Sequence, residues 1–326
     1  MTNITTKFLG LELKSPVVVS SSGLTKSVES LKEMESYGAG AVILKSLFEE
    51  QLNVEAGRLI SQSHDYPEAE DYIRGYAKHN SVDEYLKLIR NAKANISIPV
   101  IASINCVSSK DWTGFAKKIQ DAGADALELN INIIPQNGNI ESLDIESKYY
   151  DIVEKVLEEI DIPLAVKIGP HFTNIMRLVK QLQFRGVKAV TLFNRFYEPE
   201  INIDKMEMVS ASVFSKDTDI RHSLRWVGMI SGSIKNIEVA ASTGIHDGGA
   251  VVKQLLAGAQ VAQVCSVLYK KGANQIRILN DEVTAWMQEH HFETIEDFRG
   301  KMSWENIPDS QIYMRSQFMK YFSSVE

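Results

Sequence analysis

The sequence predicts an α/β fold of the (β/α)8 TIM-barrel class, formed as one domain over residues 1–326. A helical pattern that ends at glycine and leads into a short apolar run occurs four times, and four further apolar runs raise the strand candidates to eight. Helical patterns separate most successive pairs. Alternating strands and helices are typical of a parallel sheet, and eight units favour a closed barrel over the competing open, doubly wound sheet.

The strand candidates are short and apolar, which is typical of parallel strands buried on both faces. Glycine ends the preceding helix because it readily adopts the left-handed conformation found at helix C-termini. We therefore expect strands at the apolar ends of residues 37–44, 122–129, 185–192 and 257–264, and at residues 17–20, 100–103, 164–168 and 238–241.

The helical patterns carry apolar residues at three- and four-residue spacing. Two insertions, residues 46–80 and 195–237, interrupt the alternation, and barrels carry function in such loops. Residues 291–326 are rich in charged and aromatic side chains, and we expect them to pack as a helical tail. The predicted helices span residues 27–37, 82–94, 112–122, 148–159, 173–185, 248–256 and 275–290.

The composition disfavours several classes of protein. A net charge of −7 without a Lys/Arg-rich run disfavours a nucleic-acid partner. No apolar run approaches the ~18 residues that span a bilayer, and the N-terminus lacks a signal-peptide pattern, so we expect a cytoplasmic protein without a membrane partner. Cys106 and Cys265 lie far apart beside apolar residues, which favours reduced thiols over a disulfide or a metal site.

Two lysines, Lys45 and Lys167, stand at the carboxyl ends of apolar strand candidates. This is an unusual place for lysine, because a barrel interior must neutralise the charge. One interpretation is a buried ion pair, for instance with Glu128. The other is an electron-rich ligand such as the pyrimidine edge of a flavin, which gains negative charge on reduction, and Lys167 suits that role.

The other strand ends carry small or amide side chains, which we expect to converge on one rim of the barrel. Strands seven and eight end in Ser242-Thr243-Gly244 and Cys265-Ser266, and turns of small residues after these strands commonly bind phosphate. The remaining candidates are Ser21, Ser22 and Gly23 after strand one, Ser46 after strand two, Asn130 and Asn132 after strand four, and Asn194 after strand six.

In order and spacing these residues resemble the class 1 dihydroorotate dehydrogenases. The resemblance covers nearly the whole chain and continues into residues 294–300. It implies a barrel that binds FMN at its mouth and transfers hydride between dihydroorotate, or a similar dihydropyrimidine, and the flavin in pyrimidine biosynthesis. The matching segments are Ser21-Ser22-Gly23, Lys45-Ser46, Glu128-Leu129-Asn130, Val166-Lys167, Asn194, Ser242-Thr243-Gly244-Ile245 and Gln263-Val264-Cys265-Ser266.

The resemblance also implies a role for each candidate residue. Lys45, Asn130 and Asn132 are the candidate catalytic residues. Lys45, Asn80, Asn130 and Asn194 are the expected substrate-binding residues. FMN is expected to contact Ser21, Ser22, Gly23, Lys45, Ser46, Asn130, Lys167 and Asn194 around its ring, and Ser242, Thr243, Gly244, Cys265 and Ser266 at its phosphate.

Two segments depart from the family pattern. After strand four the family carries a serine or cysteine that removes the substrate proton, whereas residues 130–137 contain neither. Isoleucine and asparagine cannot replace it, because neither titrates near neutral pH. His171, His79 or a water held by Asn132 are the alternative bases. The family's glycine pair after strand six is also missing, since residues 210–215 read Ser-Ala-Ser-Val-Phe-Ser.

The leading hypothesis is therefore an FMN-dependent oxidoreductase acting on CH–CH bonds. A flavin-free lyase or isomerase, with Lys45 or Lys167 forming a Schiff base, is one alternative. A non-catalytic FMN-binding paralogue that lost the base is the other. Analogy with the family further suggests a homodimer and an electron-transfer partner subunit, and no metal site is expected.

Overall fold

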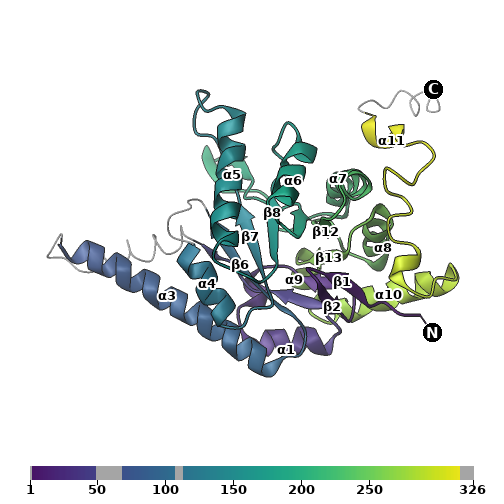
Figure 1. The fold of residues 1–326 in the computed structure, drawn as a ribbon, viewed down its shortest axis with the longest axis horizontal. Helices are drawn as coiled ribbons and strands as arrows, with labels where there is room; N and C mark the ends of the chain where they lie inside the picture. Colours follow the sequence, from purple (N-terminus) through teal and green to yellow (C-terminus); the bar gives the residue numbers. More distant parts are fainter. Residues whose placement is uncertain (1, 49–67, 107–112, 316–326) are drawn as a thin grey trace.

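Eight parallel strands close into a barrel in the computed structural model of the protein (Figure 1). The structure describes residues 2–48, 68–106 and 113–315, and the side chains of residues 48, 68–80, 106 and 113 lie outside that description. The pairing of the second strand with the third, and of the eighth with the first, closes the sheet. In barrel order the strands are β3 (Val17–Val19), β4 (Ala41–Ile43), β6 (Val100–Cys106), β7 (Ala126–Ile131), β8 (Leu164–Ile168), β9 (Ala189–Leu192), β12 (Glu238–Ser242) and β13 (Val261–Val264).

The predicted fold class and all eight predicted strands are confirmed. The glycines that precede four of the strands have the left-handed conformation predicted for helix ends, with φ of +89° at Gly38, +96° at Gly123, +100° at Gly186 and +115° at Gly258. Each reverses the chain within a few residues, so that the next strand re-enters the sheet in parallel. A short strand, β5 (Leu47–Phe48), adds to β6 beside the mouth.

Helices surround the barrel and match the predicted positions (Figure 1). Two helices begin earlier than predicted. Helix α3 begins at residue 68 rather than 82, which is 14 residues earlier, and α5 begins at residue 142 rather than 148, which is six residues earlier. Two helices were not predicted, α7 within the second insertion and the short α9 (Ser266–Lys271) after β13. The longer helices are α1 (Val28–Ser36), α3 (Glu68–Asn95), α4 (Thr113–Asp121), α5 (Ser142–Leu157), α6 (Ile175–Phe184), α7 (Ile220–Ser233), α8 (Gly248–Ala257) and α10 (Gln275–Glu289).

Two hydrophobic layers position the site. The larger lies between the strands and the surrounding helices. The smaller fills the amino-terminal half of the barrel and includes Phe8, Leu9 and Leu13, all at most 3% exposed, from the hairpin of β1 (Thr6–Phe8) and β2 (Leu11–Leu13). This hairpin seals the amino end of the barrel, so polar residues at the opposite end line the open mouth.

The second insertion builds one wall of that mouth. After β9 the chain forms an antiparallel hairpin of β10 (Pro199–Asn202) and β11 (Glu207–Ser210), then a 3-10 turn, η2 (Asp217–Asp219), and then α7. Apolar side chains on this hairpin are exposed, including Ile203 and Met206.

The tail packs across α7 and α8. The amide of Trp304 donates to the carbonyl of Gly228 at 3.0 Å, and the amide of Gly300 donates to the carbonyl of Leu255 at 3.0 Å. Within residues 291–315 the helical segments are short, a 3-10 turn η3 (Ile295–Asp297) and a four-residue α11 (Gln311–Met314).

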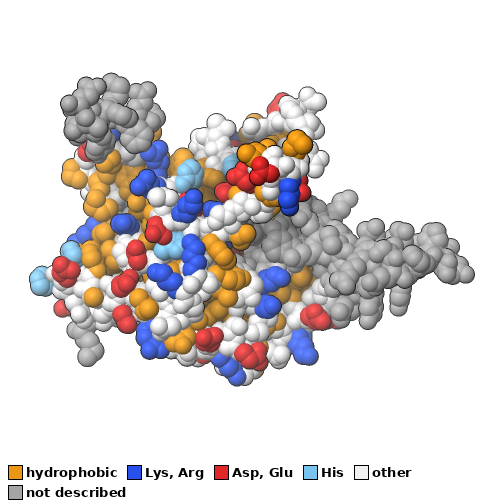
Figure 2. Space-filling view, turned by 180° about the vertical axis from the view of Figure 1, so that it is seen from behind, with side chains coloured by type: hydrophobic (Ala, Val, Ile, Leu, Met, Phe, Trp, Pro, Cys, Tyr) orange, Lys and Arg blue, Asp and Glu red, His pale blue; other side chains and the backbone are white. Residues whose placement is uncertain are grey.

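The surface is of mixed charge. On the face shown in Figure 2, acidic and basic side chains are interspersed among the described residues rather than gathered into a stripe of one sign. Among the described residues no helix is both long and apolar enough to cross a bilayer.

Candidate functional site

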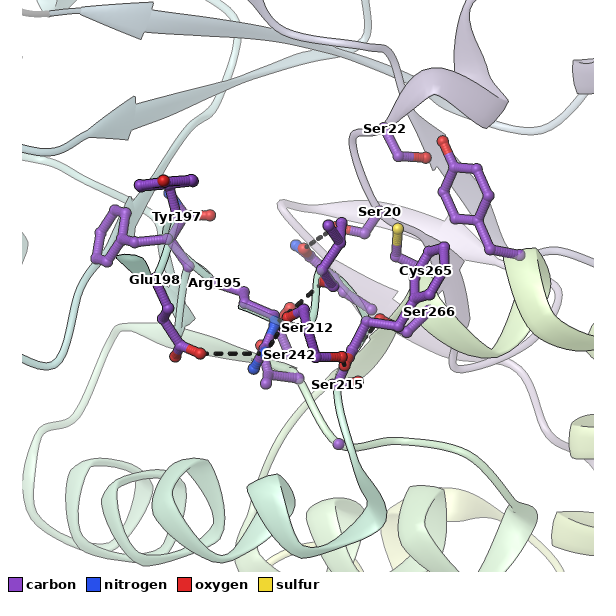
Figure 3. A pocket seen from close by; sticks show the side chains of 18 of the residues that line it. Ser20, Ser22, Arg195, Tyr197, Glu198, Ser212, Ser215, Ser242, Cys265 and Ser266 are labelled. Atoms are coloured by element: carbon purple, nitrogen blue, oxygen red, sulfur yellow. Dashed lines mark hydrogen bonds and ion pairs between the residues drawn. The ribbon is translucent and has the colours of Figure 1, made fainter. Parts of the chain in front are cut away.

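Two adjoining cavities open at the carboxyl ends of the strands. The main cavity has a volume of about 550 Å³ and lies beside the ends of β3, β12 and β13 (Figure 3). The side cavity has a volume of about 500 Å³ and lies toward β4 and β7. Seven residues line both cavities, so the two form one continuous site: Ser21, Ser22, Lys167, Asn194, Arg195, Phe196 and Tyr197.

Lys167 stands at the centre of this site and is only 6% exposed. Its ammonium donates to the Ser20 hydroxyl at 3.1 Å and to the Gln263 side-chain oxygen at 3.4 Å, and it lies 4.0 Å from the Glu128 carboxylate. Barrel closure brings these residues together, because β3 pairs with β13 and β7 with β8. The structure thus bears out the ion pair of Lys167 with Glu128, and Lys167 also lines both cavities, where a ligand could contact it.

Only one of the two Glu128 carboxylate oxygens accepts hydrogen bonds from the described residues. Thr191 and Gln263 donate to Oε2 at 2.8 and 2.9 Å, whereas Oε1 is buried without a hydrogen-bond partner among the described residues. An unpaired buried acceptor is costly, and the Lys167 ammonium, 4.0 Å from Oε1, is the opposite charge that faces it.

A chain of hydroxyls lines the side cavity next to Lys45. The hydroxyls of Ser21 and Ser46 lie 2.9 Å apart, and those of Ser46 and Ser103 lie 2.7 Å apart. The Tyr85 hydroxyl fixes the strand beneath them, because it accepts from the Ser103 amide at 2.8 Å and donates to the Ser103 carbonyl at 3.0 Å. Burial raises the pKa of this phenol far above its usual value, so Tyr85 is a structural donor.

The two predicted amides, Asn130 and Asn194, meet across the barrel. The Asn194 amide nitrogen donates to the Asn130 side-chain oxygen at 2.8 Å. This bond leaves the Asn130 nitrogen and the Asn194 oxygen as a donor and an acceptor for a ligand. Asn132 lines the side cavity as well. A planar ring with alternating donors and acceptors would match these groups.

The turn after β12 forms a tight concave wall. Thr243 and Gly244 both have left-handed backbones, with φ of +75° and +78°. The Thr243 hydroxyl stabilises the turn by donating to the Phe193 carbonyl at 3.2 Å. A Cβ on Gly244 would lie 2.1 Å from the Ile220 backbone nitrogen, so only glycine fits between the turn and α7.

Cys265 and Ser266 complete this wall one strand later, and together with Ser242, Thr243 and Gly244 they line the main cavity. The short helix α9 (Ser266–Lys271) follows directly. Burial raises the pKa of the Cys265 thiol, although Ser22 and Lys167 act in the opposite direction. Cys265 is therefore a neutral thiol near pH 7.

Residues 210–215 also line the main cavity, although they lack the glycine pair of the family pattern. Arg195 holds this loop by donating to the carbonyls of Ser212 at 2.8 Å and Val213 at 3.2 Å. An ion pair of 3.1 Å with Asp219 orients the guanidinium. Residues 210–215 therefore lie beside the cavity, although their side chains differ from the glycine pair of the family.

Sequence reasoning assigned no role to several lining residues, among them Ser20, Arg195, Gln263 and Tyr269. Ser20 ends a predicted strand, Arg195 directly follows Asn194, and Gln263 is a polar residue within an apolar strand. Each of these positions was a usable signal. Tyr269 gave none, because it approaches the cavity from α9, where its hydroxyl would lie 2.7 Å from a Cβ on Gly23.

The alternative base His171 lies outside this site. It lines a neighbouring outer cavity of about 440 Å³, which Asn132 also lines, and stacks on Phe196 at 5.7 Å between ring centroids. Phe196 lines both cavities of the site, whereas His171 lines neither. Ile133 and Ile134 also line the outer cavity. The side chains of the other two candidates, His79 and Asn80, lie outside the described residues.

A closed (β/α)8 barrel with a buried lysine, two facing amides and a cup of small residues (Ser242, Thr243, Gly244, Cys265 and Ser266) after its last two strands defines the class of barrel proteins whose site lies at the carboxyl ends of the strands. A sequence model of the dihydroorotate dehydrogenase family matches residues 3–287. The chain therefore belongs to the dihydroorotate dehydrogenase family, as the sequence resemblance indicated.

Several curated relatives extend over the full length of this match. The chain is 26% identical over 314 residues to the catalytic subunit of dihydroorotate dehydrogenase B (NAD(+)) of Thermoplasma volcanium, covering 92% of this chain and 98% of the relative. It is 24% identical over 305 residues to the protein of that name from Methanocaldococcus jannaschii, covering 90% and 96%. A third, from Brachyspira hyodysenteriae, is 26% identical over 313 residues, covering 92% and 99%. The predicted class, an oxidoreductase of the dihydroorotate dehydrogenase type, is confirmed by these matches.

Proposed function

We propose that the protein binds FMN across the two adjoining cavities and transfers hydride between the flavin and a C–C bond of a small dihydropyrimidine. One observation carries the proposal: three groups line one continuous site. They are Lys167, the hydrogen-bonded pair of Asn130 and Asn194, and the cup formed by Ser242, Thr243, Gly244, Cys265 and Ser266. Each group suits one part of the ligand. Lys167 suits a ring edge that gains negative charge, the two asparagines suit a ring with polar edges, and the cup suits a phosphate.

The residues present fit FMN. The cup lacks side-chain bulk at Gly244, where a Cβ would meet backbone, and carries the Ser266 hydroxyl, which suits a phosphate. Lys167 supplies a buried positive charge, which favours the pyrimidine edge of a flavin. Ser21, Ser22 and Gly23 would lie along the ring. When bound, FMN supplies the hydride-accepting chemistry that no side chain has.

The substrate end of the site is the side cavity, where Lys45, Asn130 and Asn132 converge. Lys45 would neutralise a substrate carboxylate, and the amides would orient a ring through their free donor and acceptor. We retain Asn80 as a proposed fourth contact. This arrangement holds an anionic substrate such as dihydroorotate.

This chain differs from its family in the group that transfers the proton, because residues 130–137 lack the family's serine or cysteine. Residues 131–137 include no titratable side chain, and His171 lines neither cavity of the site. We propose that a water bonded to Asn132 carries the proton. Because such a water is a weak base, dihydroorotate should reduce the flavin slowly.

This same observation supports the second candidate, a flavin-binding paralogue that does not turn over dihydroorotate. The two candidates differ in one measurement. A visible spectrum of the purified protein, followed by anaerobic addition of dihydroorotate, should show a flavin band that bleaches slowly. A flavin band that bleaches no faster than without dihydroorotate would support the paralogue.

The flavin-free Schiff-base alternative is tested in the same experiment. Ser20, Gln263 and Glu128 hold the Lys167 side chain in place, and these contacts would have to break before its nitrogen could attack a carbonyl. Colourless protein in which borohydride traps a carbonyl substrate on lysine would overturn the flavin proposal.

We further propose a cytoplasmic homodimer that passes electrons to a partner subunit. The support for the partner is that the three relatives are named as catalytic subunits of NAD(+)-linked enzymes. Light scattering of the pure protein, and NADH-dependent flavin reduction with and without a co-expressed second subunit, test the two parts separately.

A further inference from the structure

Behind the main cavity lies a buried serine–histidine pair that the proposed reaction does not use. The Ser215 hydroxyl lies 2.9 Å from Nε2 of His246, and the two residues are 3% and 6% exposed. Ser215 lines the main cavity, whereas His246 stands behind it on the loop after β12. Figure 3 shows Ser215 beside Ser242 and Ser266, the wall assigned to the phosphate.

Ser215 is fixed in this position from two further directions. Its amide donates to the Ser266 hydroxyl at 3.0 Å, and its carbonyl accepts from the Lys270 ammonium at 2.8 Å. Both main-chain groups are thus occupied, and the hydroxyl is the one group of Ser215 whose proton can be redirected. Its direction depends on the proton state of His246.

Four charged groups act on His246 from the neighbouring elements. Asp217 of η2 lies 3.8 Å from Nδ1, and Asp247, whose carboxylate caps α8 by accepting from the Ala250 amide at 2.7 Å, adjoins His246 in the chain. Lys270 and Lys271 belong to α9. Burial lowers the pKa of His246, the two lysines lower it further, and the two aspartates raise it. The free protein therefore holds a neutral imidazole near pH 7.

The position of Asp217 selects the tautomer of this neutral imidazole. A carboxylate facing Nδ1 favours a proton there, which leaves Nε2 as a bare acceptor. The Ser215 hydroxyl must then donate to His246, and it presents only lone pairs to the cavity. Protonated His246 instead donates from Nε2, so the Ser215 hydroxyl proton turns free to bond an anion, and a positive charge stands directly behind it.

We propose that His246 is a proton-linked positioning residue that couples phosphate binding in the main cavity to the uptake of one proton, acting through the Ser215 hydroxyl. This inference rests on the proposed FMN function, because it takes the cofactor phosphate as the anion. A phosphate beside Ser215 favours protonated His246, so the pKa of His246 is higher in the bound protein than in the free protein. Between those two values the affinity for the phosphate falls as pH rises, by up to tenfold per pH unit.

The experiment compares FMN with riboflavin, which lacks the phosphate, in fluorescence titrations of apoprotein from pH 5.5 to 8.5. The variant His246→Gln is the matched control, because the Gln amide can donate to Ser215 at every pH and does not titrate. We expect the FMN dissociation constant of the wild type, divided by that of H246Q, to rise with pH by up to tenfold per unit. The ratio cancels the ionisation of the phosphate itself, and the riboflavin ratio should stay constant.

The route through Ser215 is tested by Ser215→Ala, which should remove the pH dependence of the ratio while His246 remains. A direct readout is the imidazole resonance of His246 in NMR titrations, whose pKa should rise when inorganic phosphate or FMN is added. This readout needs no variant, so it also serves if H246Q fails to fold.

The outcomes separate this inference from the function on which it rests. If neither FMN nor riboflavin binds at any pH, the proposed function fails and this inference fails with it. If FMN binds but the wild-type and H246Q constants change in parallel with pH, or the His246 pKa is the same with and without phosphate, the coupling is refuted while the FMN site stands.

Discussion

The Lys167 ammonium and the Glu128 carboxylate face each other at 4.0 Å inside the barrel, and Gln263 hydrogen-bonds to both. Among the described residues, neither Lys167 nor Glu128 forms a second ion pair. The pair is therefore interdependent, and each member should be costly to remove alone.

Lys167→Met should lower the free energy of unfolding by about 3–5 kcal/mol, because it leaves the Glu128 carboxylate buried without its counter-charge. The double variant Lys167→Met with Glu128→Gln should recover most of this loss and still bind flavin weakly. Urea denaturation and flavin titration measure the two effects. Lys7→Met, in an exposed pair with Glu12, is the control and should leave the free energy of unfolding nearly unchanged, because water screens that pair. A double variant as unstable as the single one would show that the pair is not the cause.

Gly244→Ala should abolish flavin binding and destabilise the protein, because its Cβ would collide with the Ile220 backbone nitrogen. Gly10→Ala is a matched control, since Gly10 also has a left-handed backbone, with φ of +73°, but nothing within 4 Å of its Cβ position. The control should lose about 1–2 kcal/mol, the conformational cost alone. Flavin content and thermal unfolding check both. Equal losses in the two variants would mean that the close approach at Gly244 is unimportant.

Asn132→Ala should weaken the binding of orotate about fivefold, the effect of one lost neutral hydrogen bond. His171→Ala should leave orotate affinity unchanged, because His171 lines neither cavity of the site. Orotate titration followed by the flavin absorbance band measures both constants. A larger effect from His171→Ala than from Asn132→Ala would place the substrate in the outer cavity instead.

Alkylation of Cys265 by iodoacetamide should be slow at pH 7 and should rise about tenfold per pH unit without reaching a plateau by pH 9. Burial raises the thiol pKa above its ordinary value of 9.0, so the reactive thiolate is rare over this range. Mass spectrometry of the peptide that contains Cys265 gives the rate, with N-acetylcysteine as the reference. A plateau below pH 8 would indicate a thiolate stabilised by Lys167.

The strands and most helices were predictable because their signals are local. The glycine at the end of each repeated unit and the apolar run after it are adjacent in sequence, as in Gly258 and Val261–Val264. Helix α7 escaped prediction because it contains Gly228 and Gly232, which lower helix propensity. A Cβ on Gly232 would lie 2.8 Å from the Glu305 amide nitrogen, so this glycine serves the approach of a tail some 70 residues later.

Site residues that directly follow a strand could be predicted from the sequence. Contacts that form only when the barrel closes could not. Lys45, Asn130, Lys167 and the cup after β12 and β13 could be read from position alone. The contact of Ser20 with Lys167 requires β3 to lie beside β13, which no local pattern encodes. The pairing of Ser215 with His246 likewise depends on how the second insertion folds back over the rim.

The β1–β2 hairpin, with Phe8, Leu9 and Leu13 buried under the barrel, also bears on the catalytic cycle that we propose. Because the hairpin closes the amino end of the barrel, a cofactor bound above this floor would be reached from the mouth. An oxidisable substrate and a diffusible electron acceptor would then share that entrance, so the first product would depart before the acceptor arrives. Under the proposed function, this floor therefore favours two alternating half-reactions.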